Sequence, residues 1–316
     1  MTRETITVQR FYLDHSAKLD LHLLGGAAGL RRRIREPTVN RPGLALAGHT
    51  KYFARHRVQV MGHAEVTYLQ TLPRAERQQR YASLFSYPLP CVVFCRDLPP
   101  DRDCLRAAEA KGIPLLKSSL ITMKFINLAT LALEQLFAPR ASEMGSMVDI
   151  HGVGVLIRGE SGIGKSESIL ALIERGYSLV ADDITKVMLV DGRDVIGTSS
   201  ELTRNHMEIR GIGIVNVAAM FGAKSIRQEK RIDLIVTLKL WDEVKDVERL
   251  GMEEEFQEVL GIPIPHVTIP VRPGRDLARL IEVAALHTKL RRAGYNPAQE
   301  LDDRIKAHMA AQPRGR

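Results

Sequence analysis

The sequence contains few cysteines: Cys91, Cys95 and Cys104 are the only three in 316 residues, and they lie close together. An odd, clustered number does not make a disulfide framework, and no second pair completes a zinc site. We therefore expect reduced, structural thiols, as is usual in a reducing compartment.

Long apolar runs are also absent from the sequence. None approaches the ~18 residues that a membrane helix requires, and the first residues, MTRETITVQRFYLDHS, contain no apolar core of a signal peptide. These absences predict a cytoplasmic protein without a membrane partner.

Clustered basic residues are equally scarce. The net charge is +8, but the lysines and arginines are scattered, and only RRRIR at 31–35 forms a short run, without interleaved aromatics. Nucleic-acid binding favours basic patches, so we expect no nucleic-acid partner and interpret the run as a solvated face. Attraction to nucleotide phosphates or to an acidic protein also fits the charge.

The length of 316 residues and the hydrophobic content of 45% suit a globular protein with domains of ~100–200 residues each. Residues 1–135 alternate apolar and helix-like segments, with strands expected at 56–62, 90–98 and 113–119 and helices at 67–85, 101–112 and 120–137. This alternation predicts an N-terminal α/β domain with a partly parallel sheet. Periodicity is lost at 138–147, which predicts a linker or exposed loop entering a second domain at 136–316.

The stretch GESGIGKSE at 159–167 matches the phosphate-binding pattern Gly-x4-Gly-Lys-Ser/Thr, with Gly159, Gly164, Lys165 and Ser166 at the required places. In such a loop the backbone N–H groups and the helix N-terminus hold phosphates. Lys165 would reach the β and γ oxygens, and Ser166 would bind Mg²⁺.

The context of this loop supports the motif. A β-rich run at 148–159 precedes it, and an amphipathic segment at 166–176 follows it and ends at Gly176, a typical C-terminal glycine of a helix. The sequence therefore predicts a strand, a phosphate loop and a helix in succession, so the motif has the expected element on either side.

Two carboxylates, Asp182 and Asp183, end the next predicted strand at 176–183. A strand-end aspartate near a phosphate loop commonly holds Mg²⁺, and a second one could accept a proton from an attacking hydroxyl. A turn or helix cap built from aspartates is the alternative.

The segment MEIRGIGIVNV at 207–217 places Glu208 and Arg210 before an apolar, buried-type strand. Glu208 is a candidate Mg²⁺ ligand and Arg210 a candidate phosphate partner, because Mg²⁺ prefers oxygen and arginine supplies a bidentate fork. A salt bridge between the two would explain the pair equally well.

Taken together, these segments resemble the HPr kinase/phosphorylase family over nearly the whole chain. The resemblance rests on GESGIGKSE, LVADD and MEIRGIGIVNV, on ERLG at 248–251 and IPVRPGRDLA at 269–278, and on NRPGLALAG at 40–48 in the N-terminal domain. It implies an N-terminal α/β domain, then a P-loop kinase domain with C-terminal helices, here at 276–294 and 296–312.

The resemblance also implies an activity and its partners. Members of the family use ATP or pyrophosphate, with Mg²⁺, to phosphorylate a serine of the phosphocarrier protein HPr, and they reverse the reaction by phosphorolysis with inorganic phosphate. They assemble as homohexamers. The acceptor here is accordingly expected to be HPr or a related phosphocarrier.

Residue roles follow from the same resemblance, position by position. Asp183 matches the base for phosphorylation and the acid for dephosphorylation, Lys165 and Arg249 match catalytic positions, and Ser166 and Glu208 match the metal site. The nucleotide-binding residues are Gly159, Glu160, Ser161, Gly162, Ile163, Gly164, Lys165 and Ser166. The phosphorolysis loop is Pro270, Val271, Arg272, Pro273, Gly274 and Arg275, in which the two arginines are candidates to hold the attacking phosphate.

One position departs from the family pattern. A catalytic histidine is expected fifteen residues before Gly159, and Met144 stands there. Methionine neither titrates nor donates a hydrogen bond, so the balance of kinase and phosphorylase activity is open. His151, in the strand predicted at 148–159, is either a substitute for the missing imidazole or a packed or surface residue.

Two other classes of function stay open from the sequence alone. One is a small-molecule kinase related to phosphoenolpyruvate carboxykinase, and the other is a module that senses nucleotide without catalysis. Met144 favours the second, whereas the intact Asp182, Asp183, Glu208 and Arg249 argue against it.

Overall fold

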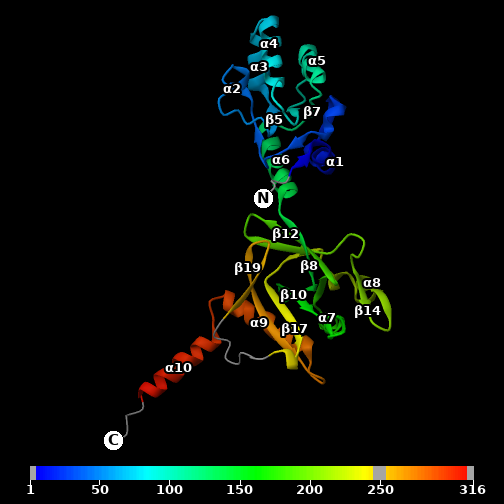
Figure 1. Cartoon of the computed structure of the whole chain (residues 1–316), viewed down its shortest axis with the longest axis vertical. Helices are drawn as coiled ribbons and strands as arrows, with labels where there is room; N and C mark the ends of the chain where they lie inside the picture. Colours follow the sequence, from blue (N-terminus) through cyan, green and yellow to red (C-terminus); the bar gives the residue numbers. More distant parts are fainter. Residues whose placement is uncertain (1–4, 245–253, 312–316) are drawn as a thin grey trace. The chain divides into compact units, whose positions relative to one another are not determined.

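The computed structural model describes residues 5–244 and 254–311 of the chain. The chain divides into two compact units, Met1–Ala138 and Pro139–Arg316, and each carries its own sheets and helices (Figure 1). Both are mixed α/β units, and two helices end the second. These features confirm the predicted fold class.

The first unit is built on a five-stranded sheet in the order β2-β7-β6-β5-β4. The four strands β4 to β7 are parallel, and β2 pairs antiparallel with β7 at the edge, which confirms the partly parallel sheet. The strands are β1 Ile6–Thr7, β2 Leu21–Gly25, β3 Arg33–Ile34, β4 Val39–Asn40, β5 Val58–Met61, β6 Val92–Phe94 and β7 Leu115–Ser118. The helices are α1 Val8–Leu19, α2 Gly43–Leu46, α3 His63–Thr71, α4 Arg74–Phe85, α5 Arg102–Ala110 and α6 Thr122–Phe137, with the 3₁₀ helix η1 Ala27–Arg31.

The three cysteines lie in the core of this unit. Cys91, Cys95 and Cys104 are all buried and free, and burial raises the pKa of the Cys91 and Cys95 thiols to about 12. A thiol with so high a pKa is a poor nucleophile. The prediction of reduced, structural cysteines is therefore confirmed.

The second unit contains a six-stranded sheet in the order β11-β9-β10-β17-β19-β18 and a four-stranded sheet in the order β16-β13-β12-β8. Strands β14 and β15 form a separate hairpin. The strands are β8 Arg140–Met144, β9 Ser146–Ile150, β10 Val153–Gly159, β11 Ser178–Ala181, β12 Ile184–Val190, β13 Asp194–Thr198, β14 His206–Ile209, β15 Gly213–Asn216, β16 Glu229–Arg231, β17 Leu234–Leu240, β18 Glu255–Val259 and β19 Ile262–Val271. The helices are α7 Lys165–Glu174, α8 Val217–Phe221, α9 Leu277–Arg292 and α10 Pro297–Ala311, with the 3₁₀ helices η2 Ala223–Ser225 and η3 Trp241–Glu243.

Three layers make up the second unit. Successive residues of β10 and β17 face opposite sides of the six-stranded sheet, as the two-residue period of a strand requires. Val155 and Val236 pack with α7 and α9 on one face. Leu156 and Ile235 pack with β12 and β13 of the four-stranded sheet on the other. The helices therefore cover one face and the second sheet covers the opposite one.

Three parallel strands position the functional segments. Strands β10, β17 and β19 run side by side in the same direction, so their carboxyl ends lie together on one side of the unit. The loop 159–164 follows β10, Trp241 follows β17 and the loop 272–275 follows β19. Segments far apart in the sequence thus meet on this side.

Three local predictions were wrong. The expected loop at 138–147 contains β8 and the start of β9, because β8 pairs with β12 along its whole length at a sheet edge, where its residues alternate between exposed and half-buried. The single strand expected at 148–159 is a hairpin of β9 and β10, and His151 lies in its turn with a φ of 51°. The strand after Glu208 is not buried, because β15 pairs only with β14 and leaves Ile214 76% exposed.

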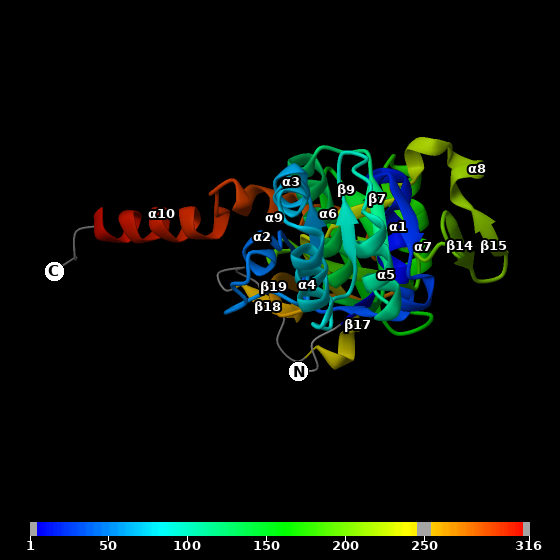
Figure 2. The same ribbon diagram turned by 90° about the horizontal axis from the view of Figure 1, so that it is seen from above.

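Helix α10 extends away from the sheets of its own unit in both views (Figures 1 and 2). The side chain of Asn296 accepts hydrogen bonds from the backbone N–H groups of Ala298 and Gln299, and Pro297 occupies the first helical position. These contacts confirm the predicted start of this helix.

Candidate functional site

The phosphate loop connects β10 to α7. Gly162 and Gly164 adopt φ angles of 83° and 102°, and Gly164 is the N-cap of α7. These left-handed angles favour glycine, and a Cβ on Gly164 would lie 3.4 Å from the Leu277 side chain of α9. The loop therefore needs its glycines for backbone conformation, and its N–H groups are left at a helix N-terminus, a natural site for anions.

Lys165, the first residue of α7, reaches back across the loop. Its ammonium donates hydrogen bonds to the carbonyl oxygens of Gly159, at 2.6 Å, and Glu160, at 2.8 Å. Ser166 follows in the first helical turn, with its side chain only partly buried. The lysine is thus held over the loop, where an ammonium can meet the oxygens of a nucleotide.

Asp182 and Asp183 lie where the chain leaves the six-stranded sheet after β11 and enters the four-stranded sheet at β12. The opposite crossing, from β8 to β9, occurs beside it at Gly145, whose N–H donates to the carbonyl oxygen of Asp183 at 2.8 Å. Asp183 has a φ of 56°, in the left-handed region that aspartate tolerates better than most residues. The two crossings hold each other in place.

Asp182 faces inward and Asp183 faces solvent. Oδ1 of Asp182 accepts a hydrogen bond from the Ser146 hydroxyl at 2.8 Å, and Oδ2 accepts one from the Glu208 amide at 3.1 Å. Burial raises the pKa of Asp182, and these two bonds oppose the rise by favouring the carboxylate. The exposed Asp183 is the carboxylate of the pair that a substrate can reach.

Ser146 ties the two aspartates together. Its hydroxyl donates to Asp182 and accepts from the backbone N–H of Asp183 at 3.0 Å, and the residue is 1% exposed. Sequence reasoning missed it, because 138–147 was interpreted as a loop. A signal was present, since Ser146 is the polar residue that opens the otherwise apolar run SMV.

The β14–β15 hairpin brings Glu208 and Arg210 to this region; β14 contacts α7, and Figure 2 shows the hairpin with α8 beside α7. Arg210 Nη2 donates to the Ser161 hydroxyl at 3.3 Å, and Nη1 lies 3.0 Å from the position of a Cβ on Gly162. No ion pair joins Glu208 to Arg210 within the described ranges. Arg210 therefore packs on the phosphate loop instead of forming the salt bridge that was the alternative.

The loop after β19 is anchored on itself and on Trp241. The Arg272 guanidinium stacks 3.2 Å from the centroid of the Trp241 ring, and Arg275 donates to the carbonyl oxygen of Pro270 at 3.0 Å. In the part of the chain that the structure describes, neither arginine forms a hydrogen bond or ion pair with the phosphate loop. Sequence reasoning missed Trp241, the only tryptophan of the chain.

Met144 lies beside the catalytic candidates. It pairs with Ile184, the residue after Asp183, across β8 and β12, and its side chain is 73% exposed. His151 lies instead in the turn that precedes β10, where its ring is hydrogen-bonded to the Tyr177 hydroxyl at 2.7 Å. Because the length of β10 separates His151 from Met144, His151 does not stand in for an imidazole at position 144.

Some expectations concern residues or ligands outside these contacts. Arg249 lies outside the described residues. Among the described residues, none of the helices combines the length and apolar character that a bilayer crossing requires. The same residues contain no group of three or more His, Cys, Asp and Glu side chains arranged to hold a metal.

A glycine loop between a strand and a helix, with a lysine across it and carboxylates on the neighbouring crossing, defines a phosphotransferase of the P-loop class. Comparison with known proteins is more specific. Residues 6–133 match the model "HPr Serine kinase N terminus", and residues 135–305 match "HPr Serine kinase C-terminal domain". The chain belongs to the HPr serine kinase family.

Two curated relatives match over nearly the whole chain. The HPr kinase/phosphorylase of Bacillus licheniformis is 42% identical over 292 residues, 92% of this chain and 94% of that protein. The HPr kinase/phosphorylase of Geobacter sulfurreducens is 40% identical over 315 residues, 100% of this chain and 99% of that protein. The solved structure of the Hpr(Ser) kinase/phosphatase from Coxiella burnetii is 31% identical, covers 51% of this chain and 98% of its own, and superposes with a TM-score of 0.47.

Proposed function

We propose that this protein transfers the γ-phosphoryl group of ATP, or a phosphoryl group of pyrophosphate, to a serine of HPr or a related phosphocarrier, and that it removes the group by phosphorolysis. One observation supports the proposal: the β14 segment links the two parts of the candidate site, because the Glu208 amide donates to Asp182, beside Asp183, and Arg210 donates to Ser161 of the phosphate loop, in a chain that is 40% identical over its whole length to an HPr kinase/phosphorylase.

In the forward direction Asp183 would act as the base. A serine hydroxyl is a weak nucleophile, so a carboxylate that accepts its proton speeds attack on the γ-phosphorus. The serine O–P bond forms as the bond from the γ-phosphorus to the bridging oxygen breaks, and ADP leaves. The exposure of Asp183 and its backbone bonds to Gly145 and Ser146 support this role.

Positive charge would stabilise the transferring group. Lys165 and the N–H groups of Gly159 to Ser166 would surround the nucleotide phosphates, and charge spread over the equatorial oxygens is the main target of catalysis in phosphoryl transfer. We assign Arg249 the same task on the family resemblance alone.

Ser166 and Glu208 would hold Mg²⁺. Both offer oxygen, the ligand that Mg²⁺ prefers, and the contact between β14, which carries Glu208, and α7, which carries Ser166, supports their proximity. The bound ion would neutralise phosphate charge.

In the reverse direction inorganic phosphate would attack phosphoserine. A phosphate oxygen forms a new bond to the phosphorus of phosphoserine as the serine O–P bond breaks, so pyrophosphate and free serine result, and Asp183 would return a proton to the serine oxygen. Arg272 and Arg275 are proposed to hold the attacking phosphate. Stacking on Trp241 supports this for Arg272, because a stacked guanidinium keeps its in-plane N–H donors free.

The assembly and location are also proposals. Leu301, Ile305 and Met309 are exposed at four-residue intervals on α10 and form an apolar stripe, which supports contacts between subunits of a homohexamer. A cytoplasmic location follows from the family's carrier substrate. Native mass spectrometry would test the assembly, and a monomer at working concentrations would refute it.

The direct test is intact-mass detection of phosphate transfer from ATP and Mg²⁺ to HPr. The matched control is HPr with its acceptor serine replaced by alanine. We expect a single added phosphate on HPr alone, reversed by inorganic phosphate. Transfer to the alanine variant, or to neither protein, would contradict the proposal.

A further inference from the structure

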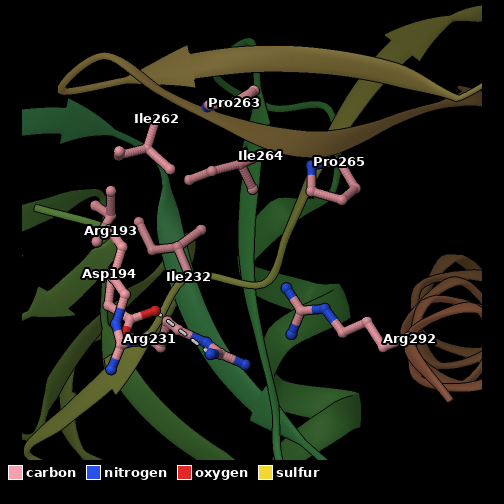
Figure 3. A pocket seen from close by; sticks show the side chains of 10 residues that line it. Arg193, Asp194, Arg231, Ile232, Ile262, Pro263, Ile264, Pro265 and Arg292 are labelled. Atoms are coloured by element: carbon pink, nitrogen blue, oxygen red, sulfur yellow. Dashed lines mark hydrogen bonds and ion pairs between the residues drawn. The ribbon is translucent and has the colours of Figure 1, made fainter.

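A cavity of about 320 Å³ lies in the second unit where β17 and β19 begin (Figure 3). Its lining comes from the start of β13, the end of β16, the start of β19 and the end of α9. The lining residues are Arg193, Asp194, Val195, Arg231, Ile232, Ile262, Pro263, Ile264, Pro265 and Arg292.

This cavity is distinct from the phosphate loop. Asp233, just before β17, accepts a hydrogen bond from the Gly154 amide near the start of β10, whereas Leu238 pairs with Gly159 at its end. The five residue steps between Asp233 and Leu238 span about 16 Å of strand. The cavity therefore lies at the amino ends of these strands, whereas the nucleotide site lies at their carboxyl ends.

Two of its arginines are held rigidly by a buried carboxylate. Asp233 is 1% exposed; its Oδ1 accepts from Arg231 Nε at 2.7 Å and from Arg292 Nη1, and its Oδ2 is used by Gly154. Figure 3 shows the guanidinium groups of Arg231 and Arg292 extending toward one another. Their shared anchor fixes both groups before any ligand arrives, which lowers the entropy lost on binding.

In the described part of the chain, the third arginine, Arg193, makes only one long ion-pair contact, and its charge gives the cluster a net positive charge. Arg193 Nε lies 3.8 Å from Asp194, and Arg231 Nη1 lies 3.4 Å from the same carboxylate. Three guanidinium groups thus face two carboxylates, a net charge of +1. Each guanidinium carries five N–H donors, so donors remain for another acceptor.

The facing wall is apolar. Ile232 and Ile264 are each 3% exposed, and Ile262, Pro263 and Pro265 complete the wall above the guanidinium groups (Figure 3). A site with fixed cations on one side and an apolar wall on the other suits a ligand with both characters. The volume lies near the lower end of the ~300–1,000 Å³ range of small-molecule sites.

We propose that this cavity binds a small organic oxyanion, a carboxylate or a phosphate group carried on a short apolar body. The oxyanion accepts hydrogen bonds from the arginine cluster, of the charge-assisted and often bidentate kind. The apolar body packs against the isoleucines and prolines.

Isoleucine methyl groups provide a readout that does not depend on catalysis. The full chain is labelled with ¹³C at isoleucine methyls and titrated with 3-methylbutanoate or 3-methylbutyl phosphate, which share one carbon skeleton. We expect saturable shifts at Ile232 and Ile264 with at least one probe. Ile163 of the phosphate loop reports separately on binding there. The responding probe identifies the oxyanion.

Matched variants test the role of the arginine cluster. Arg193→Gln should weaken binding by about fivefold or more, the equivalent of ~1 kcal/mol. Arg304→Gln is the control, because both side chains are 77% exposed and 3.8 Å from a carboxylate partner, and it should leave the affinity unchanged. Absence of saturable shifts at Ile232 and Ile264 with both probes, or equal weakening by both variants, would overturn the proposal.

Discussion

Replacing Ser146 by alanine tests how the two aspartates of the site are held. The change removes a hydroxyl that donates to Asp182 at 2.8 Å and accepts from the Asp183 amide at 3.0 Å, in a residue that is 1% exposed. Alanine fits the same space, so the loss of these two bonds is the main effect.

The cost follows from the two groups left without a partner. An unsatisfied buried polar group costs ~1–3 kcal/mol. We expect about 2–4 kcal/mol for the pair, because Asp182 is only partly buried and water can replace part of the loss. For a domain of this size each kcal/mol lowers Tm by ~2–4 °C, so Tm should fall by about 5–15 °C.

The loss should also depend on pH. The pKa of Asp182 is raised in the folded protein from its ordinary value of 3.8, so ionising this group costs folding free energy as pH rises through the folded-state pKa. The Ser146 hydroxyl favours the ionised form, and its removal raises the pKa further. The difference in Tm between variant and wild type should therefore be larger at about pH 8 than at about pH 5.

Thermal unfolding at both pH values is the assay, with Ser142→Ala as control. Ser142 lies four residues earlier, on β8, and is exposed, so its replacement should leave Tm within about 1 °C. Equal losses for the two variants, or a Ser146→Ala loss that does not grow with pH, would refute the reasoning.

Three further predictions concern catalysis. Asp183→Asn should lower serine phosphorylation by about 10²–10⁴-fold without a change in Tm, because asparagine tolerates the φ of 56° but does not accept the proton; intact mass and thermal unfolding check both, and an active variant would exclude Asp183 as base. Arg275→Ala should slow phosphorolysis about tenfold or more and leave phosphorylation within about twofold; unchanged pyrophosphate release would remove this arginine from the mechanism. Met144→His adds an imidazole, with an ordinary pKa of ~6.5, beside Asp183. The rate of phosphotransfer should therefore gain a pH dependence near neutrality. Identical pH–rate profiles for variant and wild type would show that the residue at position 144 does not affect the reaction.

Local features of the fold could be predicted from the sequence. The phosphate loop is contiguous in sequence, so its glycines, Lys165 and Ser166 predict a nucleotide site from one short stretch. Helices α7 and α9 follow from amphipathic periodicity and from glycines at their ends. The partly parallel sheet of the first unit follows from alternating strands and helices. In each case the physical cause, a backbone conformation or a buried face, lies within neighbouring residues.

Only the tertiary structure revealed how distant segments meet. Strand β8 looked like a loop because it is a sheet-edge strand whose partner, β12, lies far along the chain. Ser146 reaches Asp182 because β9 pairs with β11, and the oxyanion cavity exists because Arg193, Arg231 and Arg292 converge from separate elements. The sequence by itself determined the chemistry of the phosphate loop, whereas strand pairing between remote segments determined which side chains surround it. Such pairing depends on register and burial across the whole unit, and no local pattern of residues encodes it.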